Sequence, residues 1–350
     1  MASAAPAPPR APALLAALLL PACSARFDES GAHPGDPGHA DSIDSAPDSA
    51  DSRDPDTAGP PPAPPPPVCH AYGPSVQRGA VVEPSLEEIS GVAVSQRNPG
   101  VLWVMEDHGG LNEVYALDGA GNWLGKVILD GVENNDWEDI AVHPCGDTSC
   151  VYVGDTGDND HDRTYHAVLR FPEPEMAVGA VADHALTPEV YPYAFPDGLF
   201  LDSEALAILP DGTPVVFSKD YVTGTSTPYT FPLLDSTQTV TLLAHAAFST
   251  GEATETWGAA TTGADLWPDG SRLLLRTYGH VWEYTLPLVE GAATVQALDS
   301  LPTAPREALH TGVERTGEAI GYDTVHRGYW TVSEGVNPAL WYTGCADPGL

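Results

Sequence analysis

The chain has 350 residues and carries 14 Lys and Arg against 49 Asp and Glu, which gives a formal net charge of −35. Binding of nucleic acid depends on clustered basic side chains that neutralise phosphates. This balance therefore predicts no nucleic-acid partner, and it disfavours free polyanionic substrates.

The first residues have the pattern of a signal peptide, which we predict over residues 1–22. Ala11 to Leu20 is an apolar run that is too short to span a bilayer but suits a signal-peptide core. The following Leu20-Pro21-Ala22-Cys23 resembles the bacterial lipobox, in which cleavage leaves a lipidated cysteine. This resemblance implies lipid on Cys23 and a protein of the bacterial cell envelope, on the outer membrane or cell surface, that touches the membrane through its lipid anchor only. The alternative is cleavage after Ala25, which leaves no lipid.

Residues 23–67 are predicted to be a disordered tether. They are rich in Asp, Ser, Ala, Gly and Pro and end in a proline run over residues 60–67. They lack the apolar residues that a core needs. Self-repulsion should extend the acidic part, and the proline run should form a stiff spacer. We expect no chemistry in this segment.

A short phrase, in which an acidic residue leads into a small and apolar strand, occurs five times in the rest of the chain. The copies begin at Glu88, Glu138, Glu204, Asp265 and Glu318. Their leading acids are separated by 50, 66, 61 and 53 residues, a spacing typical of propeller blades.

Further apolar runs after each phrase predict the other strands of each blade. The second runs are residues 101–105, 151–153, 214–217, 273–275 and 329–332; the third are 114–117, 166–169, 229–231, 281–284 and 340–342; the fourth are 124–129, 190–193, 240–243 and 293–297. The fifth repeat has no room for a fourth strand, and residues 76–82 can supply it and close the ring. Residues 68–350 are therefore predicted to be an all-β propeller of five four-stranded blades, with six blades or a two-sheet sandwich as the alternatives.

Four cysteines of this domain form two natural pairs. Cys145 and Cys150 flank a tight turn, and Cys69 and Cys345 stand at the two ends of the domain. We predict a disulfide for each pair, in agreement with secretion into an oxidising compartment. A zinc site is the rival interpretation, but ligand-spaced histidines do not accompany the pairs.

The innermost strands of a propeller line a central channel, so the five leading acids should form a ring there. Ionised carboxylates around a channel repel one another unless a cation joins them or their pKa values rise. We therefore expect calcium at Glu88, Glu138, Glu204, Asp265 and Glu318. The alternative is that each acid caps a strand or pairs with a neighbouring blade.

Two further groups of residues are candidates for the same site. The ends of the second strands add Asp107, Asp155, Lys219, Arg276 and Glu334. The second blade also contributes Asp158 and Asn159, whose spacing in a glycine-bearing loop suits calcium but equally suits plain β-turns. His108 could act as a general base if it faces the channel, although a loop histidine is more often merely exposed.

The phrases Glu-Ile-Ser-Gly, Asp-Trp-Glu-Asp-Ile-Ala, Gly-Asp-x-Gly-Asp-Asn, Ser-Glu-Ala-Leu and Gly-Glu-Ala-Ile, between Glu88 and Glu334, resemble those of a family of bacterial secreted propeller-like proteins. The Glu-Ala-Leu phrases are also similar to those of phytase-like esterases and gluconolactonase-type calcium propellers. That similarity implies channel carboxylates holding a metal that polarises a phosphate or a lactone carbonyl. The chain departs from the pattern because it offers only Lys219 and Arg276 as bases, and only Asn134, Asn135 or Asn159 as amide ligands.

Two functions follow from these observations. The first is a calcium-binding propeller that binds a small ligand or a surface protein. The second is a metal-dependent hydrolase of esters, lactones or phosphoesters, in which Lys219 and Arg276 stabilise the developing anion and Asp107 or His108 moves protons.

Overall fold

The structure is a computed structural model that describes residues 66–83, 86–251 and 257–347. The predicted signal peptide, Cys23 and all of the predicted tether except its last two residues lie outside these ranges. Among the described residues there is no helix that is long and apolar enough to cross a membrane.

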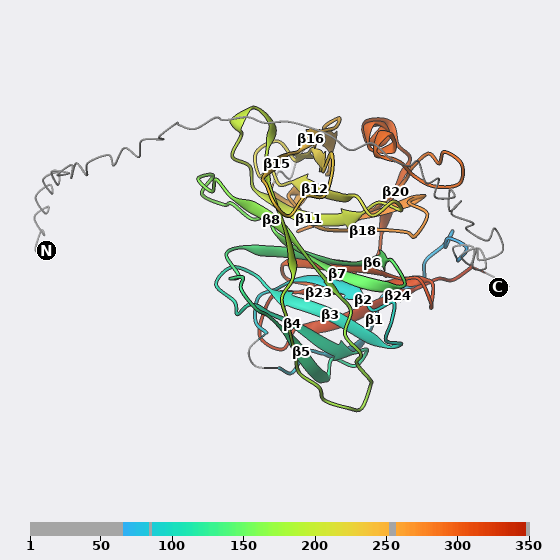
Figure 1. Cartoon of the computed structure of the whole chain (residues 1–350). Helices are drawn as coiled ribbons and strands as arrows, with labels where there is room; N and C mark the ends of the chain where they lie inside the picture. The colour runs from blue at the N-terminus through green and yellow to red at the C-terminus, as the bar shows by residue number, and fades with distance from the viewer. Residues whose placement is uncertain (1–65, 84–85, 252–256, 348–350) are drawn as a thin grey trace, which may run out of the picture. The chain divides into compact units, whose positions relative to one another are not determined.

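The described chain forms five blade sheets, each built around consecutive antiparallel strands as the repeat predicts, and one small two-stranded sheet (Figure 1). The strands of the first blade, from the inside outward, are β2 (Ile89–Val94), β3 (Val101–Glu106), β4 (Glu113–Asp118) and β5 (Trp123–Leu129), with β9 (His184–Leu186) added in parallel at the outer edge. Those of the second blade are β6 (Trp137–Cys145), β7 (Thr148–Asp155), β8 (His166–Pro172) and β10 (Glu189–Ala194), with β15 (Val240–Thr241) added in parallel.

The other three blades have four strands each. The third has β11 (Ser203–Ile208), β12 (Pro214–Ser218), β14 (Pro228–Thr230) and β16 (Leu243–Ala244); the fourth has β18 (Thr261–Leu266), β19 (Arg272–Thr277), β20 (Val281–Thr285) and β21 (Arg306–Leu309); the fifth has β22 (Gly317–Asp323), β23 (Gly328–Ser333), β24 (Ala339–Gly344) and β1 (Val76–Ala80). A small separate sheet joins β13 (Thr225–Ser226) to β17 (Phe248–Ser249), and three short 3-10 helices are η2 (Pro196–Gly198), η3 (Trp257–Ala259) and η4 (Val295–Thr303).

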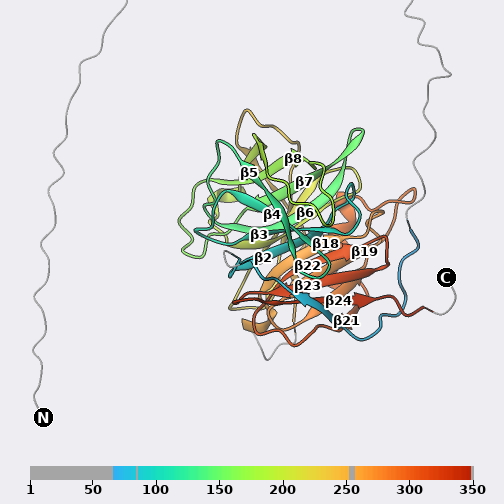
Figure 2. The same ribbon diagram turned by 90° about the horizontal axis from the view of Figure 1, so that it is seen from below.

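The blades close into a ring, so the prediction of a five-bladed propeller is confirmed. The inner strands contact one another in the order β2, β6, β11, β18, β22 and back to β2. In Figure 2 the inner strands β2, β18 and β22 lie toward the middle and β24 toward the edge. Strand β1 pairs with β24, as predicted for the ring closure.

Both predicted disulfides are present. Cys69 is bonded to Cys345 across 276 residues of sequence, and Cys145 is bonded to Cys150. The first bond joins the residues just before β1 to those just after β24. It therefore fastens the two ends of the described chain at the blade where the ring closes.

Two predicted outer strands were wrong. The apolar run 293–297 belongs largely to η4, whose Ala297, Leu298 and Leu301 are buried against blades three and four, and the outer strand of blade four is the polar β21. In blade three, β16 is the outer strand, while the preceding β15 pairs with the second blade instead. Outer strands are half exposed, so hydrophobic runs locate them poorly.

Candidate functional site

Every inner strand carries a β-bulge at the same place, next to its first residue. The pairing of each inner strand with the second strand of its blade shifts by one residue there, which leaves one extra residue on the inner strand. The five extra residues are Ser90, Glu138, Glu204, Thr262 and Glu318. A bulge redirects a side chain, so this irregularity positions five side chains at one end of the channel.

The predicted ring of five acids therefore separates into three parts. Glu138, Glu204 and Glu318 occupy the bulges and are buried, whereas Ser90 and Thr262 occupy the other two. Glu88 lies two residues before its bulge and is exposed. Asp265 lies three residues beyond Thr262, toward the other end of the channel. The sequence repeat makes the five leading acids equivalent to one another. In the structure, the equivalent positions are instead the five bulged residues.

A compact group of carboxylates surrounds Glu138 at this end, which we call the acidic mouth. Oxygens of Asp107, Asp136 and Glu138 lie within 4.8 Å of one another, and so do oxygens of Glu138, Asp202 and Glu204. Glu138 belongs to both triads. Sequence reasoning missed Asp136 and Asp202, although each stands two residues before a bulged glutamate in the shared pattern Asp-x-Glu.

Three carboxylate oxygens of the acidic mouth are buried and accept no hydrogen bond from the described part of the chain. They are Asp136 Oδ1, Glu138 Oε1 and Asp202 Oδ2. His108 Nδ1 lies 3.3 Å from Asp136 Oδ1 but bonds the carbonyl of Asn135 at 2.6 Å. Unsatisfied buried acceptors are rare because their desolvation is not compensated. Such oxygens within one compact group of carboxylates call for a donor or a cation.

Gly157 explains how the carboxylates come so close together. A Cβ at this position would overlap Glu138 Oε1 and the carboxylate of Asp136. The backbone of Gly157 therefore packs directly against both side chains, and its amide donates to the carbonyl of Asp136 at 3.2 Å.

Burial and mutual repulsion both act on these acids. Burial raises the pKa of Glu138 well above its usual range, and the Asp107 carboxylate raises it further. Burial likewise raises the pKa of Asp136 to about 6, again with a contribution from Asp107. The pKa values of Asp107 and Asp202 are also raised, chiefly by burial. The protein alone therefore does little to stabilise the ionised form of these carboxylates.

Lys219 supplies one internal positive charge to the second triad. Its ammonium forms a buried ion pair with Glu204 and donates to the Tyr278 hydroxyl at 2.8 Å. It also lies over the rings of Tyr221 and Tyr278, at 4.8 and 4.9 Å from their centroids. Burial by itself lowers the pKa of Lys219, but Glu138 and Asp202 outweigh it and raise that pKa. Lys219 is therefore a fixed cation within the group.

Arg276 does not point its charge into the acidic mouth. Its Nη2 is paired with Glu314 at 2.8 Å, and both side chains are buried. The guanidinium packs against Gly317, where a Cβ would overlap it. Arg276 thus joins β19 to the loop before β22, and it is held between blades rather than presented to a ligand.

The loop after β7 is organised by hydrogen bonds within the second blade. Asp155 is paired with Arg163 at 2.7 Å and accepts from Asn135 at 2.8 Å. Asp158 accepts from the backbone amides of Asp162 and Arg163. These contacts are those of a loop stabilised by turns. Asn159 is exposed and accepts only a 3.4 Å bond from a tyrosine hydroxyl in the described chain.

Two acids farther along the channel have a different environment. Asp139 is fully buried, and its carboxylate accepts from the backbone amides of Ile140, Leu206 and Ala264 at 2.8 to 3.0 Å. These amides belong to the inner strands of three different blades. Asp265 similarly accepts from Leu266 and from Tyr322 of the next blade, both at 2.8 Å. Both acids satisfy amides on the inner edges of blades.

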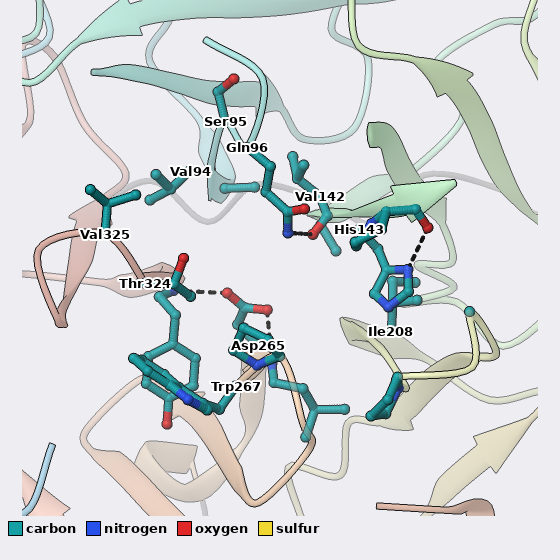
Figure 3. Close-up of a pocket in the computed structure, with 18 of the residues that line it drawn as sticks. Val94, Ser95, Gln96, Val142, His143, Ile208, Asp265, Trp267, Thr324 and Val325 are labelled. Carbon is teal, nitrogen blue, oxygen red and sulfur yellow. Dashed lines mark hydrogen bonds between the residues drawn. The ribbon is translucent and has the colours of Figure 1, made fainter. Parts of the chain in front are cut away.

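The opposite end of the channel opens into a cavity of about 500 Å³, which we call the funnel (Figure 3). All five blades line it, through residues at or beyond the ends of their inner strands. Asp265 stands at the funnel wall together with Trp267, Thr324 and His143. The acidic mouth and the funnel therefore occupy the two ends of one channel.

No protein-family model and no curated protein matches the chain. Similar solved structures include the PQQ-bound form of aldose sugar dehydrogenase from Streptomyces coelicolor, with 12% identity, a TM-score of 0.43, and coverage of 80% of this chain and 99% of that chain. The major Malassezia sympodialis allergen Mala s 1 has 11% identity, a TM-score of 0.44, and coverage of 80% and 98%. The β-propeller domain of Myceliophteria thermophila Cps50 (Swd1) has 9% identity, a TM-score of 0.38, and coverage of 73% and 83%. Such distant likenesses say nothing about activity.

Proposed function

We propose that the protein is a calcium-dependent binding module whose cation lies at the acidic mouth. The observation that carries this proposal is that two acids of one triad, Asp136 and Glu138, each have a buried oxygen that accepts no hydrogen bond from a described residue. Calcium prefers carboxylate and other oxygen ligands in a flexible geometry. A bound cation would supply the missing partner and relieve the repulsion that raises the pKa values there.

Lys219 decides which triad takes the cation. Its ammonium already balances one of the charges of the triad of Glu138, Asp202 and Glu204 through the ion pair with Glu204. Among the described residues, no lysine or arginine forms a direct ion pair with the triad of Asp107, Asp136 and Glu138, and this triad lies beside an open cleft of about 660 Å³ next to Asp136. We therefore place calcium in the first triad, with Glu138 shared between it and Lys219.

The cleft beside the first triad provides the place for a ligand. It is lined by His108, the amides of Asn134, Asn135 and Asn159, and several acids. Its one basic residue, Arg163, is already bonded to Asp155 and to the carbonyl of Gly157. A ligand that joins the cation there would bring oxygen atoms to open coordination positions. Binding of this kind needs no group that moves a proton.

The alternative is a metal-dependent hydrolase of esters, lactones or phosphoesters. One observation favours it: exposed His108 stands 3.3 Å from Asp136, where it could exchange a proton with solvent. Against it, Arg276 is held by Glu314, and Lys219 is engaged by Glu204 and Tyr278. Each of these cations already pairs with a buried carboxylate, although Nε and Nη1 of Arg276 have no hydrogen-bond partner among the described residues, and on balance the ion pairs favour binding over hydrolysis.

We also propose that the protein is anchored to the bacterial cell envelope through Cys23. In an anchored protein, the place where the tether joins the domain decides which end of the channel lies nearer the anchor. Pro66 accepts a hydrogen bond from the Trp267 indole at 3.1 Å, and Arg327 donates to the carbonyl of Pro67. Both partners lie at the funnel end of the channel. An anchored domain would thus present its acidic mouth on the side away from the point where the tether joins.

Calcium titration by calorimetry tests the proposed function. The protein should bind one calcium ion, and Glu138→Gln should weaken binding about 100-fold because it removes a charged ligand shared by both triads. The matched control is Glu88→Gln, a leading acid of the same repeated phrase that is exposed and outside the triads. Absence of calcium binding, or equal loss in the two variants, would refute the proposal.

A further inference from the structure

The funnel is a second cavity that the acidic mouth does not explain. Its volume of about 500 Å³ lies in the range of small-molecule sites, roughly 300 to 1,000 Å³. It is separated from the acidic mouth by the channel interior, where the carboxylate of Asp139 bonds amides of three inner strands. A ligand in the funnel would therefore be independent of the proposed calcium site.

The walls of the funnel are partly apolar and partly polar. Val94, Val142, Ile208 and Leu266 come from four different blades, and Trp267 adds an aromatic surface (Figure 3). Trp267 also packs edge-on against Tyr322, with ring centroids 5.1 Å apart. This lining suits the apolar body of a ligand.

Several polar groups of the funnel can accept a hydrogen bond from a ligand. Each carboxylate oxygen of Asp265 accepts one backbone amide and keeps a lone pair for a further donor. His143 bonds the carbonyl of Pro144 through Nδ1 at 2.9 Å, which places the proton on that nitrogen and leaves Nε2 as an acceptor. Asp211 adds a second carboxylate to the lining.

The charged residues that line the funnel also indicate the charge of its ligand. Neither lysine nor arginine is among the described residues that line the funnel, whereas two aspartates are. An anionic ligand would meet only like charge. An ammonium group brings both charge and donors to Asp265, and the neighbouring aromatic rings can attract a cation in addition.

We propose that the funnel binds a cationic amphipathic amine, with its ammonium group at Asp265 and its apolar body against the walls that the blades provide. No covalent step is involved. Recognition rests on one carboxylate at the wall of a partly apolar cavity, and the same carboxylate helps to join blades four and five. A ligand bound in the funnel would therefore contact a residue that also joins the inner strands of blades four and five.

The test is calorimetric titration of the full chain with 2-phenylethylamine at about pH 8.5, where Asp265 is ionised although burial raises its pKa to about 7, with both disulfides intact and calcium in excess. The neutral 2-phenylethanol and the anionic 3-phenylpropanoate are the matched probes. The amine should bind at least about 10-fold more tightly than the alcohol, and the anion should not bind, because only the ammonium pairs with Asp265. Equal binding of amine and alcohol, or no binding of the amine, would overturn the proposal.

Two variants locate the binding. Asp265→Asn should weaken amine binding about 10-fold or more by removing the charge. Thr324→Lys places an ammonium at the funnel without altering Asp265, and it should abolish binding even if the first variant folds poorly. Val313→Lys, at a valine that is 93% exposed, controls for an added charge. Amine binding that survives both funnel variants, or that is lost in Glu138→Gln instead, would show that the amine binds elsewhere and would refute the proposal.

Discussion

The two ends of the channel use the same kind of residue in opposite ways. At the acidic mouth, Asp136 and Asp202 each lie close to Glu138, and all three acids have an oxygen without a hydrogen-bond partner in the described chain. In the channel interior and at the funnel, every carboxylate oxygen of Asp139 and Asp265 accepts at least one backbone amide.

This difference separates structural acids from acids available to a ligand. The inner edge of each blade carries backbone amides, and an acid that satisfies them holds neighbouring blades together. An acid that satisfies none of them adds repulsion unless something else binds. The number of hydrogen-bond partners, rather than acidity or burial alone, therefore distinguishes the two roles.

The two ends also differ in covalent support, because both disulfides lie toward the funnel end. Replacing Cys69 and Cys345 with alanine should lower the free energy of unfolding by about 5 kcal/mol, since this bond closes the longer loop in the unfolded chain. The pair Cys145 and Cys150 spans five residues and should contribute only about 2 kcal/mol. Denaturant unfolding of the two double variants measures both values. Equal losses would mean that ring closure does not depend on the longer link.

Asp139 and Glu138 are adjacent in sequence, so they compare the two roles directly. Asp139→Ala should lower the free energy of unfolding by about 3 kcal/mol, because it leaves buried amides of three inner strands without an acceptor. Asp211→Ala is the control, since that aspartate is exposed and bonds only a local amide. A loss below that of the control would contradict the structural role of Asp139.

The funnel acid should also make stability depend on pH. Burial raises the pKa of Asp265 to about 7, above that of an unfolded aspartate. The folded state then binds the proton of Asp265 more tightly than the unfolded state does. The contribution of Asp265 to the free energy of unfolding is therefore complete at low pH and is lost as pH rises from about 4 to 7. Between about pH 4.5 and 6, comparison with Asp265→Asn should reveal a fall of about 2 kcal/mol in the free energy of unfolding that the variant lacks. A change of opposite sign would contradict this environment.

The smallest expected effect concerns Glu138 without calcium. In chelator, Glu138→Gln should raise the free energy of unfolding by about 1 kcal/mol, because it relieves repulsion from Asp107 and Asp136. Thermal unfolding in chelator and in calcium measures this, and the order of stability should reverse when calcium is added. Destabilisation in chelator would instead assign Glu138 the same role as Asp139.

The sequence predicted the propeller well because its repeat carries the periodicity of the blades. The five phrases located every inner strand, and the cysteine spacing identified both disulfides. Outer strands were predicted less well because β16 and β21 have only 2 and 4 residues and are partly exposed, so neither forms an apolar run long enough to be recognised.

The site was only partly predictable, for a geometric reason. A one-residue bulge decides which residue of each phrase enters the mouth, and nothing in the five phrases marks its place. Glu88 and Asp265 therefore seemed equivalent to Glu138. The residues Asp136 and Asp202 were visible in the repeated Asp-x-Glu pattern, whereas the partners of Asp139 come from distant blades and could not be inferred.

The most direct test of the proposed cation site is anomalous diffraction from crystals soaked in terbium, an oxygen-seeking substitute for calcium. We predict one strong anomalous peak among the carboxylates of Asp107, Asp136 and Glu138, and its loss in crystals of Glu138→Gln. A peak at the loop of Asp155 and Asp158, a peak in the funnel, or no peak in either crystal would contradict the assignment of the acidic mouth as a calcium site.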